Sequence, residues 1–127
     1  MGYRSDVSVV IYPDERNQEK YDMLKVLMGT TFKDTVALFD ANMEWRDEGC
    51  ALIFNIVDVK WYDSYTDVQA FLHMLNVLAN EVKEGGIEGY NYEMVRLGEE
   101  SDDIEFTEGG EYTAGVICVS RVVDINI

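Results

Sequence analysis

The chain has 127 residues, 47% of them hydrophobic and 12% aromatic, and its 25 Asp and Glu against 10 Lys and Arg give a formal net charge of −15. This size fits one domain over residues 1–127, and the apolar content suffices for a packed core, which excludes an intrinsically disordered chain. A field of this sign repels phosphate backbones and anionic lipids, so we expect no direct binding to nucleic acid or membranes. It attracts basic protein surfaces, although acidity can also serve solubility alone.

Cysteine content and hydropathy indicate the compartment. Cys50 and Cys118 are too few for a disulfide framework and fit reduced thiols. The residues after Met1 have no apolar core of a secretory signal, and no apolar run approaches the roughly 20 residues of a membrane helix. We therefore expect a soluble cytoplasmic protein.

The first half of the chain predicts a strand, a helix and a second strand. Residues 5–12 alternate β-branched side chains, and Pro13 ends that strand. Asp14 is the expected cap of a helix that ends at Gly29. Residues 30–45 fit either a short helix or the opening of a strand. Gly49 is free to take a positive φ in a turn, before a strand over residues 50–62 that is apolar on both faces at its start, as central strands are.

The second half predicts a helix and two further strands. Ser64 and Asp67 have the spacing of a capping box, and an apolar stripe continues the helix to about Lys83. Residues 90–97 and 113–125 have strand patterns. The element order predicts an α+β fold, a ferredoxin-like split βαβ (β-α-β-β-α-β plus an extra C-terminal strand). Its two helices would cover one face of a mainly antiparallel sheet.

An acidic segment separates the last two predicted strands. Residues 98–111 carry no base and seven acids: Glu99, Glu100, Asp102, Asp103, Glu105, Glu108 and Glu111. Such a run can imitate nucleic-acid phosphates for a basic protein, or can simply be a solvated loop. Carboxylates also suit a divalent cation, but the spacing of a calcium loop is missing, and we predict no metal site.

Three aromatic residues follow the central strand, namely Trp61, Tyr62 and Tyr65. Exposed tyrosine and tryptophan side chains make strong contact anchors, because they offer large rigid area with a polar group. In the alternative interpretation Trp61 closes the end of the core, and the two tyrosines hold the turn.

No residue pattern indicates catalysis or a cofactor. His73, the sole histidine, is predicted to face water on the second helix, and no orienting partner is apparent in the sequence. The cysteines form no Cys-x-x-Cys motif. The paired glycines at 85–86 and 109–110 lack the lysine and the strand-to-helix context of a phosphate loop.

Three blocks of the sequence resemble a family of small bacteriophage-encoded accessory proteins. They are MGYRSDV at residues 1–7, VKWYDSYTDV at 59–68 and VRLGEESDDIE at 95–105. The resemblance implies a phage origin, expression in the cytoplasm of the bacterial host and a non-structural role. It implies no catalytic residue.

These observations lead to an expected function and two alternatives. We expect a non-enzymatic acidic protein that binds a host protein with a basic surface, inhibiting a nucleic-acid-handling or defence complex by charge mimicry. The acids of residues 99–111, with Trp61, Tyr62 and Tyr65, would make the contacts. The first alternative is an assembly protein that forms a homo-oligomer through a sheet edge or an apolar face. The second is an enzyme with a carboxylate-bound metal.

Overall fold

The computed structural model describes residues 3–13, 17–38, 42–79, 90–100 and 102–109. These residues form an α+β structure with five strands and three helices. In chain order the elements are β1 (Ser5–Pro13), α1 (Gln18–Gly29), α2 (Lys33–Val36), β2 (Asn42–Arg46), β3 (Ala51–Val59), α3 (Thr66–Ala79), β4 (Tyr90–Leu97) and β5 (Ile104–Gly109).

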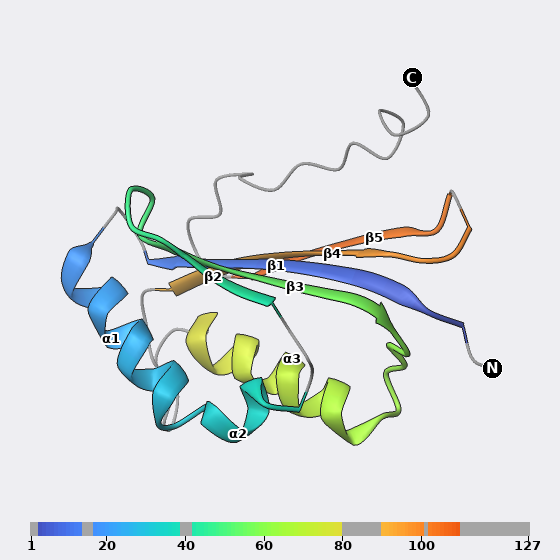
Figure 1. Cartoon of the computed structure of the whole chain (residues 1–127), viewed down its shortest axis with the longest axis horizontal. Helices are drawn as coiled ribbons and strands as arrows, with labels where there is room; N and C mark the ends of the chain where they lie inside the picture. Colours follow the sequence, from blue (N-terminus) through green and yellow to red (C-terminus); the bar gives the residue numbers. More distant parts are fainter. Residues whose placement is uncertain (1–2, 14–16, 39–41, 80–89, 101, 110–127) are drawn as a thin grey trace.

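The five strands form one antiparallel sheet in the order β2-β3-β1-β4-β5. β1 is the central strand, and its residue Val9 pairs with Phe54 on one side and Met94 on the other. The three helices lie on one face of this sheet (Figure 1). The arrangement is consistent with the predicted ferredoxin-like kind of fold.

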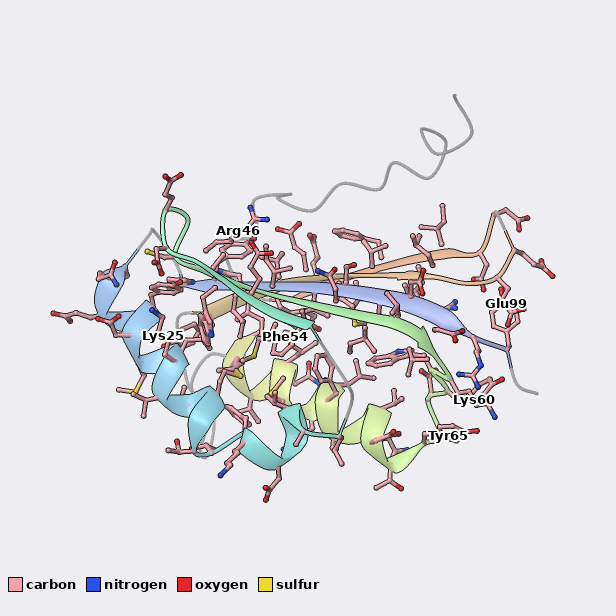
Figure 2. All side chains as sticks on the ribbon, in the orientation of Figure 1. Lys25, Arg46, Phe54, Lys60, Tyr65 and Glu99 are labelled. Carbon is pink, nitrogen blue, oxygen red and sulfur yellow. The ribbon has the colours of Figure 1, made fainter. Side chains whose placement is uncertain are left out.

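The core lies between the sheet and the helices. Alternation sends Val7, Val9 and Ile11 of β1 toward the helices, where all three are fully buried. Leu52 and Phe54 of β3 stand beside them, and Figure 2 shows Phe54 pointing into the helical layer. The helices contribute apolar stripes at helical spacing, comprising Tyr21, Leu24, Leu27 and Met28 from α1, and Val68, Phe71, Met74, Leu75 and Leu78 from α3.

The helices α1 and α3 begin later than the sequence predicted. The cap of α1 is Asn17, whose side chain accepts the Lys20 N–H (3.1 Å), so the prediction of Asp14 as cap was wrong. The helix α3 begins at Thr66, and its Asp67 carboxylate accepts the neighbouring Val68 N–H (2.8 Å). The capping box predicted at Ser64 is therefore one residue too early. The predicted end at Lys83 lies outside the described residues.

The ambiguous stretch over residues 30–45 contains both predicted possibilities, the short helix α2 and then the edge strand β2. Between β2 and β3, the Cys50 N–H donates to the Asp47 carbonyl (3.3 Å) and closes a turn. Cys50 takes a positive φ, at 53°, although Gly49 beside it is the residue freer to do so. Cys50 is buried, as its strand context indicated.

The acidic segment is where prediction and structure differ most. Its solvated-loop interpretation is wrong for residues 104–109, which form β5 and pair with β4 from Tyr92↔Gly109 to Leu97↔Ile104. The extra C-terminal strand predicted at 113–125 lies outside the described residues. No helix within the described ranges is long and apolar enough to cross a membrane.

Candidate functional site

The turn between β4 and β5 fixes the middle of the acidic segment. The Gly98 N–H donates to the Asp103 carbonyl (2.8 Å), and the Asp103 N–H donates to the Glu100 carbonyl (3.1 Å). These two backbone hydrogen bonds, and a third from the Ile104 N–H to the Asp102 carbonyl (3.1 Å), close the turn. Glu99 and Glu100 project from its tip, where both are exposed.

Arg96 of β4 holds two carboxylates across this hairpin. Its Nη2 lies 2.8 Å from Oδ1 of Asp103, and its Nε lies 3.1 Å from Oε1 of Glu105. Its Nη1 also donates to the Ser5 hydroxyl of β1 (3.0 Å). The hydrogen bond to Asp103 raises the pKa of the Arg96 guanidinium, and Glu105 acts in the same direction. One arginine thus ties β1, β4 and β5 together.

Tyr3 is a second clamp on the same turn. Its hydroxyl donates to Oδ2 of Asp103 (2.5 Å) and accepts the Glu100 N–H (3.2 Å). Donation to Asp103 raises the pKa of the Tyr3 phenol. A Cβ at Gly98 would collide with the Asp103 carboxylate and the Tyr3 hydroxyl. The glycine is therefore required for the two side chains to meet over the turn.

Two further acids, Asp6 of β1 and Asp58 of β3, lie at this end of the sheet. The Arg4 N–H donates to Glu99 (2.6 Å), and the Arg4 guanidinium donates to the Asp58 carbonyl (2.8 Å). The Asp58 N–H donates to the Asp6 carboxylate (2.9 Å). The register of β1 with β3 shifts between Ser5 and Val7, and Asp58 takes a positive φ of 54° opposite this irregularity. The irregularity places both carboxylates beside the hairpin turn.

We call this surface the acidic end, and it comprises Asp6, Asp58, Glu99, Glu100, Asp102, Asp103 and Glu105. Arg4 and Arg96 make the contacts described above with these acids, and Figure 2 shows Lys60 at the same end of the molecule as Glu99. All of the seven acids except Asp103 are exposed. Negative charge therefore exceeds positive charge at this end and faces water.

The predicted aromatic residues divide between surface and core. Tyr62 accepts the Tyr3 N–H with its hydroxyl (2.7 Å) and meets Tyr65 edge-on, with ring centroids 5.0 Å apart. Tyr65 is 41% exposed. Trp61 is only 7% exposed and packs edge-on against Phe71, with centroids 5.7 Å apart. The proposed anchor role for Trp61 therefore needs correction, because its ring closes the core and is not offered at the surface.

The remaining predicted residues lie apart or outside the described ranges. Glu108 is exposed on β5 opposite Glu93, away from the turn, and Glu111 lies outside the described residues. His73 is exposed on α3. In the part of the chain that the structure describes, no three His, Cys, Asp or Glu side chains are grouped in a way that would hold a metal ion.

Sequence reasoning missed the residues that organise this surface. Some of these residues lie far from the acidic segment in the sequence, and others lie inside predicted strands. They are Tyr3, Arg4, Asp6, Asp58 and Arg96. The register of β1 with its two neighbours brings them together, and no local pattern reports such a register.

Comparison of the chain with protein-family models, with curated proteins and with solved structures gave no match.

Proposed function

We propose that this chain is a bacteriophage accessory protein that acts in the cytoplasm of the bacterial host, where it binds a host protein through the acidic end. In this proposal the fold is a ferredoxin-like split βαβ to which β5 adds an edge strand. The protein works by occupying a basic surface, and it carries out no chemistry.

The observation that carries the proposal is the fixed placement of the carboxylates. Glu99, Glu100 and Asp102 lie on the β4–β5 turn. Tyr3 contacts Asp103 and Glu100 of this turn, and Arg96 contacts Asp103 twice. These four hydrogen bonds or ion contacts measure 2.5–3.3 Å. A surface that is ordered before binding loses less conformational entropy when it meets its partner. A charge array kept only for solubility needs no such fixation.

The electrostatics give the mode of action. A field of net charge −15 speeds encounters with a cationic partner, and the speed falls as salt screens the field. At contact, lysine and arginine side chains form charge-assisted hydrogen bonds to carboxylates as they do to phosphates. A nucleic-acid groove that is filled in this way is closed to its own ligand.

The test is affinity capture from a bacterial lysate at about 50 mM and about 500 mM salt. We expect a defined host protein, one that handles nucleic acid, to be retained at low salt and lost at high salt. Added duplex DNA should compete with the chain for that protein. Failure to retain any host protein, or retention that salt and DNA leave unchanged, would refute the proposal.

A second candidate function, self-assembly, has one observation in its favour. Val57, Ile104 and Phe106 are exposed apolar side chains, and Val57 is 71% exposed. Strand alternation places Phe106, opposite Val95, on the sheet face away from the helices. Ile104, two residues from Phe106 on the same strand, shares that face, and adjacent exposed apolar side chains often mark an interface. Light scattering after size exclusion distinguishes the two, because a stable large oligomer favours assembly and a monomer opposes it.

A further inference from the structure

A shallow groove lies on the helical side of the molecule, between the end of α2 and the first turn of α3. Its lining comprises Leu38, Ser64, Tyr65, Thr66, Asp67 and Ala70. Leu38 is 49% exposed and Tyr65 is 41% exposed, and both line this one hollow. The groove therefore presents apolar surface that the described residues leave open to water.

Two tyrosines join the groove to the acidic end. The Tyr65 ring meets the Tyr62 ring, and the Tyr62 hydroxyl accepts the N–H of Tyr3. Tyr3 in turn donates to Asp103 of the hairpin. Figure 2 shows Tyr65, Lys60 and Glu99 at the same end of the molecule. One partner segment can therefore reach both the apolar groove and the carboxylates.

The charges around the groove determine which type of partner side chain can enter it and which type can lie beside it. The first turn of α3 carries the partial positive charge of a helix N-terminus, which disfavours a cation placed directly on it. Asp67 already accepts an N–H of that turn, so an anion gains little there. An apolar side chain carries no charge, so neither effect disfavours its binding there. Cationic side chains beside it would instead face Asp63, which is exposed, and the acidic end.

We infer that the groove receives an apolar side chain from a basic segment of the partner protein, with lysine or arginine beside it. This inference rests on the proposed function and adds the class of sequence that is recognised. The acidic end supplies attraction to any cationic surface, and the groove supplies selectivity, because only a segment with an apolar residue at the right place fills it.

Two synthetic peptides test the inference with defined probes. One has three lysines, a central Leu-Phe pair and three lysines, and the other has Ser-Ser in place of Leu-Phe. The peptides carry equal charge, so a difference in their affinity reports the groove. We expect the Leu-Phe peptide to bind the full chain about tenfold more tightly, the effect of burying one large apolar side chain.

Matched variants locate the effect. Tyr65→Ser and Leu38→Ser should each reduce the advantage of the Leu-Phe peptide to less than about threefold. Val26→Ser, which removes an exposed apolar side chain on α1, should leave the tenfold advantage intact. Circular dichroism would verify that all three variants are folded.

The outcomes separate the two proposals. If both peptides bind with equal affinity and both are released by salt, the acidic surface remains a binder and the groove inference is wrong. An equal loss with Val26→Ser would also overturn it, because the contact would then not be at the groove. If neither peptide binds at low salt, the inference and the electrostatic basis of the proposed function fail together.

Discussion

Arg96 and Asp103 form a two-point ion pair across the β4–β5 hairpin, with Nη2–Oδ1 at 2.8 Å and Nη1–Oδ2 at 3.3 Å. Their side chains are 16% and 30% exposed, so water screens this pair less than the other ion pairs of the described residues. Asp103 also accepts the Tyr3 hydroxyl. This half-buried carboxylate therefore joins Arg96 and Tyr3 at the β4–β5 turn, in addition to the backbone hydrogen bonds that close it.

Removing that carboxylate should weaken the fold. We expect Asp103→Ala to lower the free energy of unfolding by about 1–3 kcal/mol, since Arg96 and Tyr3 each lose a charge-assisted partner. Asp102→Ala, which changes charge equally at an exposed neighbour, should stay within about 0.5 kcal/mol of the native chain. Urea denaturation measures both, and equal losses would show that the pair does not stabilise the hairpin.

Gly98 provides an independent test of the contact between Tyr3 and Asp103. A Cβ at this position collides with the Asp103 carboxylate and the Tyr3 hydroxyl, whereas a Cβ at Gly49 meets nothing within 4 Å. Gly98→Ala should therefore destabilise the protein by about 1–3 kcal/mol, and Gly49→Ala should change stability by less than about 1 kcal/mol. The thermal midpoints of the two variants give the comparison. A Gly98→Ala protein as stable as the native chain would mean that Tyr3 and Asp103 do not meet over the turn.

The sequence predicted those elements whose signal is local and strong. β1 and β4 alternate apolar residues, and their predicted bounds at 5–12 and 90–97 agree with the structure to within one residue. The strand β5 was missed because acids interrupt its alternation, and acidic residues are poor strand formers in isolation. Pairing with β4, through contacts such as Phe106↔Val95 and Glu105↔Arg96, defines this strand.

The candidate site was predictable only in part for the same reason. The run of carboxylates from Glu99 to Glu105 is evident in the sequence. Its partners Tyr3 and Arg4 come from the other end of the chain, 95 or more residues away, and depend on strand register. Likewise Trp61 and Tyr65 have similar sequence contexts, and only tertiary packing decides that the first is buried and the second exposed.

The free energy of unfolding at alkaline pH should depend on Tyr21. Burial, followed by the hydrogen bond to Asp47 (2.7 Å), raises the pKa of the Tyr21 phenol above its ordinary value of 10.0. A group whose pKa is higher in the folded state contributes stability below its unfolded pKa and loses it as pH rises through the folded pKa. Stability should therefore fall above about pH 10. Tyr3, Tyr90 and Tyr92, whose pKa values are also raised, should add to this fall.

Tyr21→Phe should make that fall shallower, because one raised phenol is gone. Unfolding free energies measured by urea between about pH 8 and pH 11.5 give the slope. Leu38→Ala, which removes an exposed side chain that does not ionise, should leave the slope as it is in the native chain. A Tyr21→Phe slope equal to the native one would contradict a destabilising ionisation at this position.

Trp61 and Tyr65 should differ in what their removal affects. Trp61→Ala should lower the free energy of unfolding by about 3–5 kcal/mol, because it leaves a cavity beside Phe71. Tyr65→Ala should cost less than about 1 kcal/mol and should instead reduce partner binding. Paired denaturation and binding measurements distinguish the roles, and a Trp61→Ala protein of native stability would contradict its placement in the core.

The most direct test of the central claim compares two triple variants of equal charge. Glu99→Gln, Glu100→Gln and Asp102→Asn neutralise the acidic end. Glu19→Gln, Asp22→Asn and Glu48→Gln remove the same charge from α1 and the β2–β3 turn, at the opposite end of the molecule (Figure 1). Binding of the captured host protein is measured for both at the same ionic strength. We expect the first triple to lose at least tenfold in affinity and the second less than threefold, because in our proposal the placement of the carboxylates determines recognition. Equal losses would show that net charge alone attracts the partner, and unchanged binding by the first triple would place the contact elsewhere.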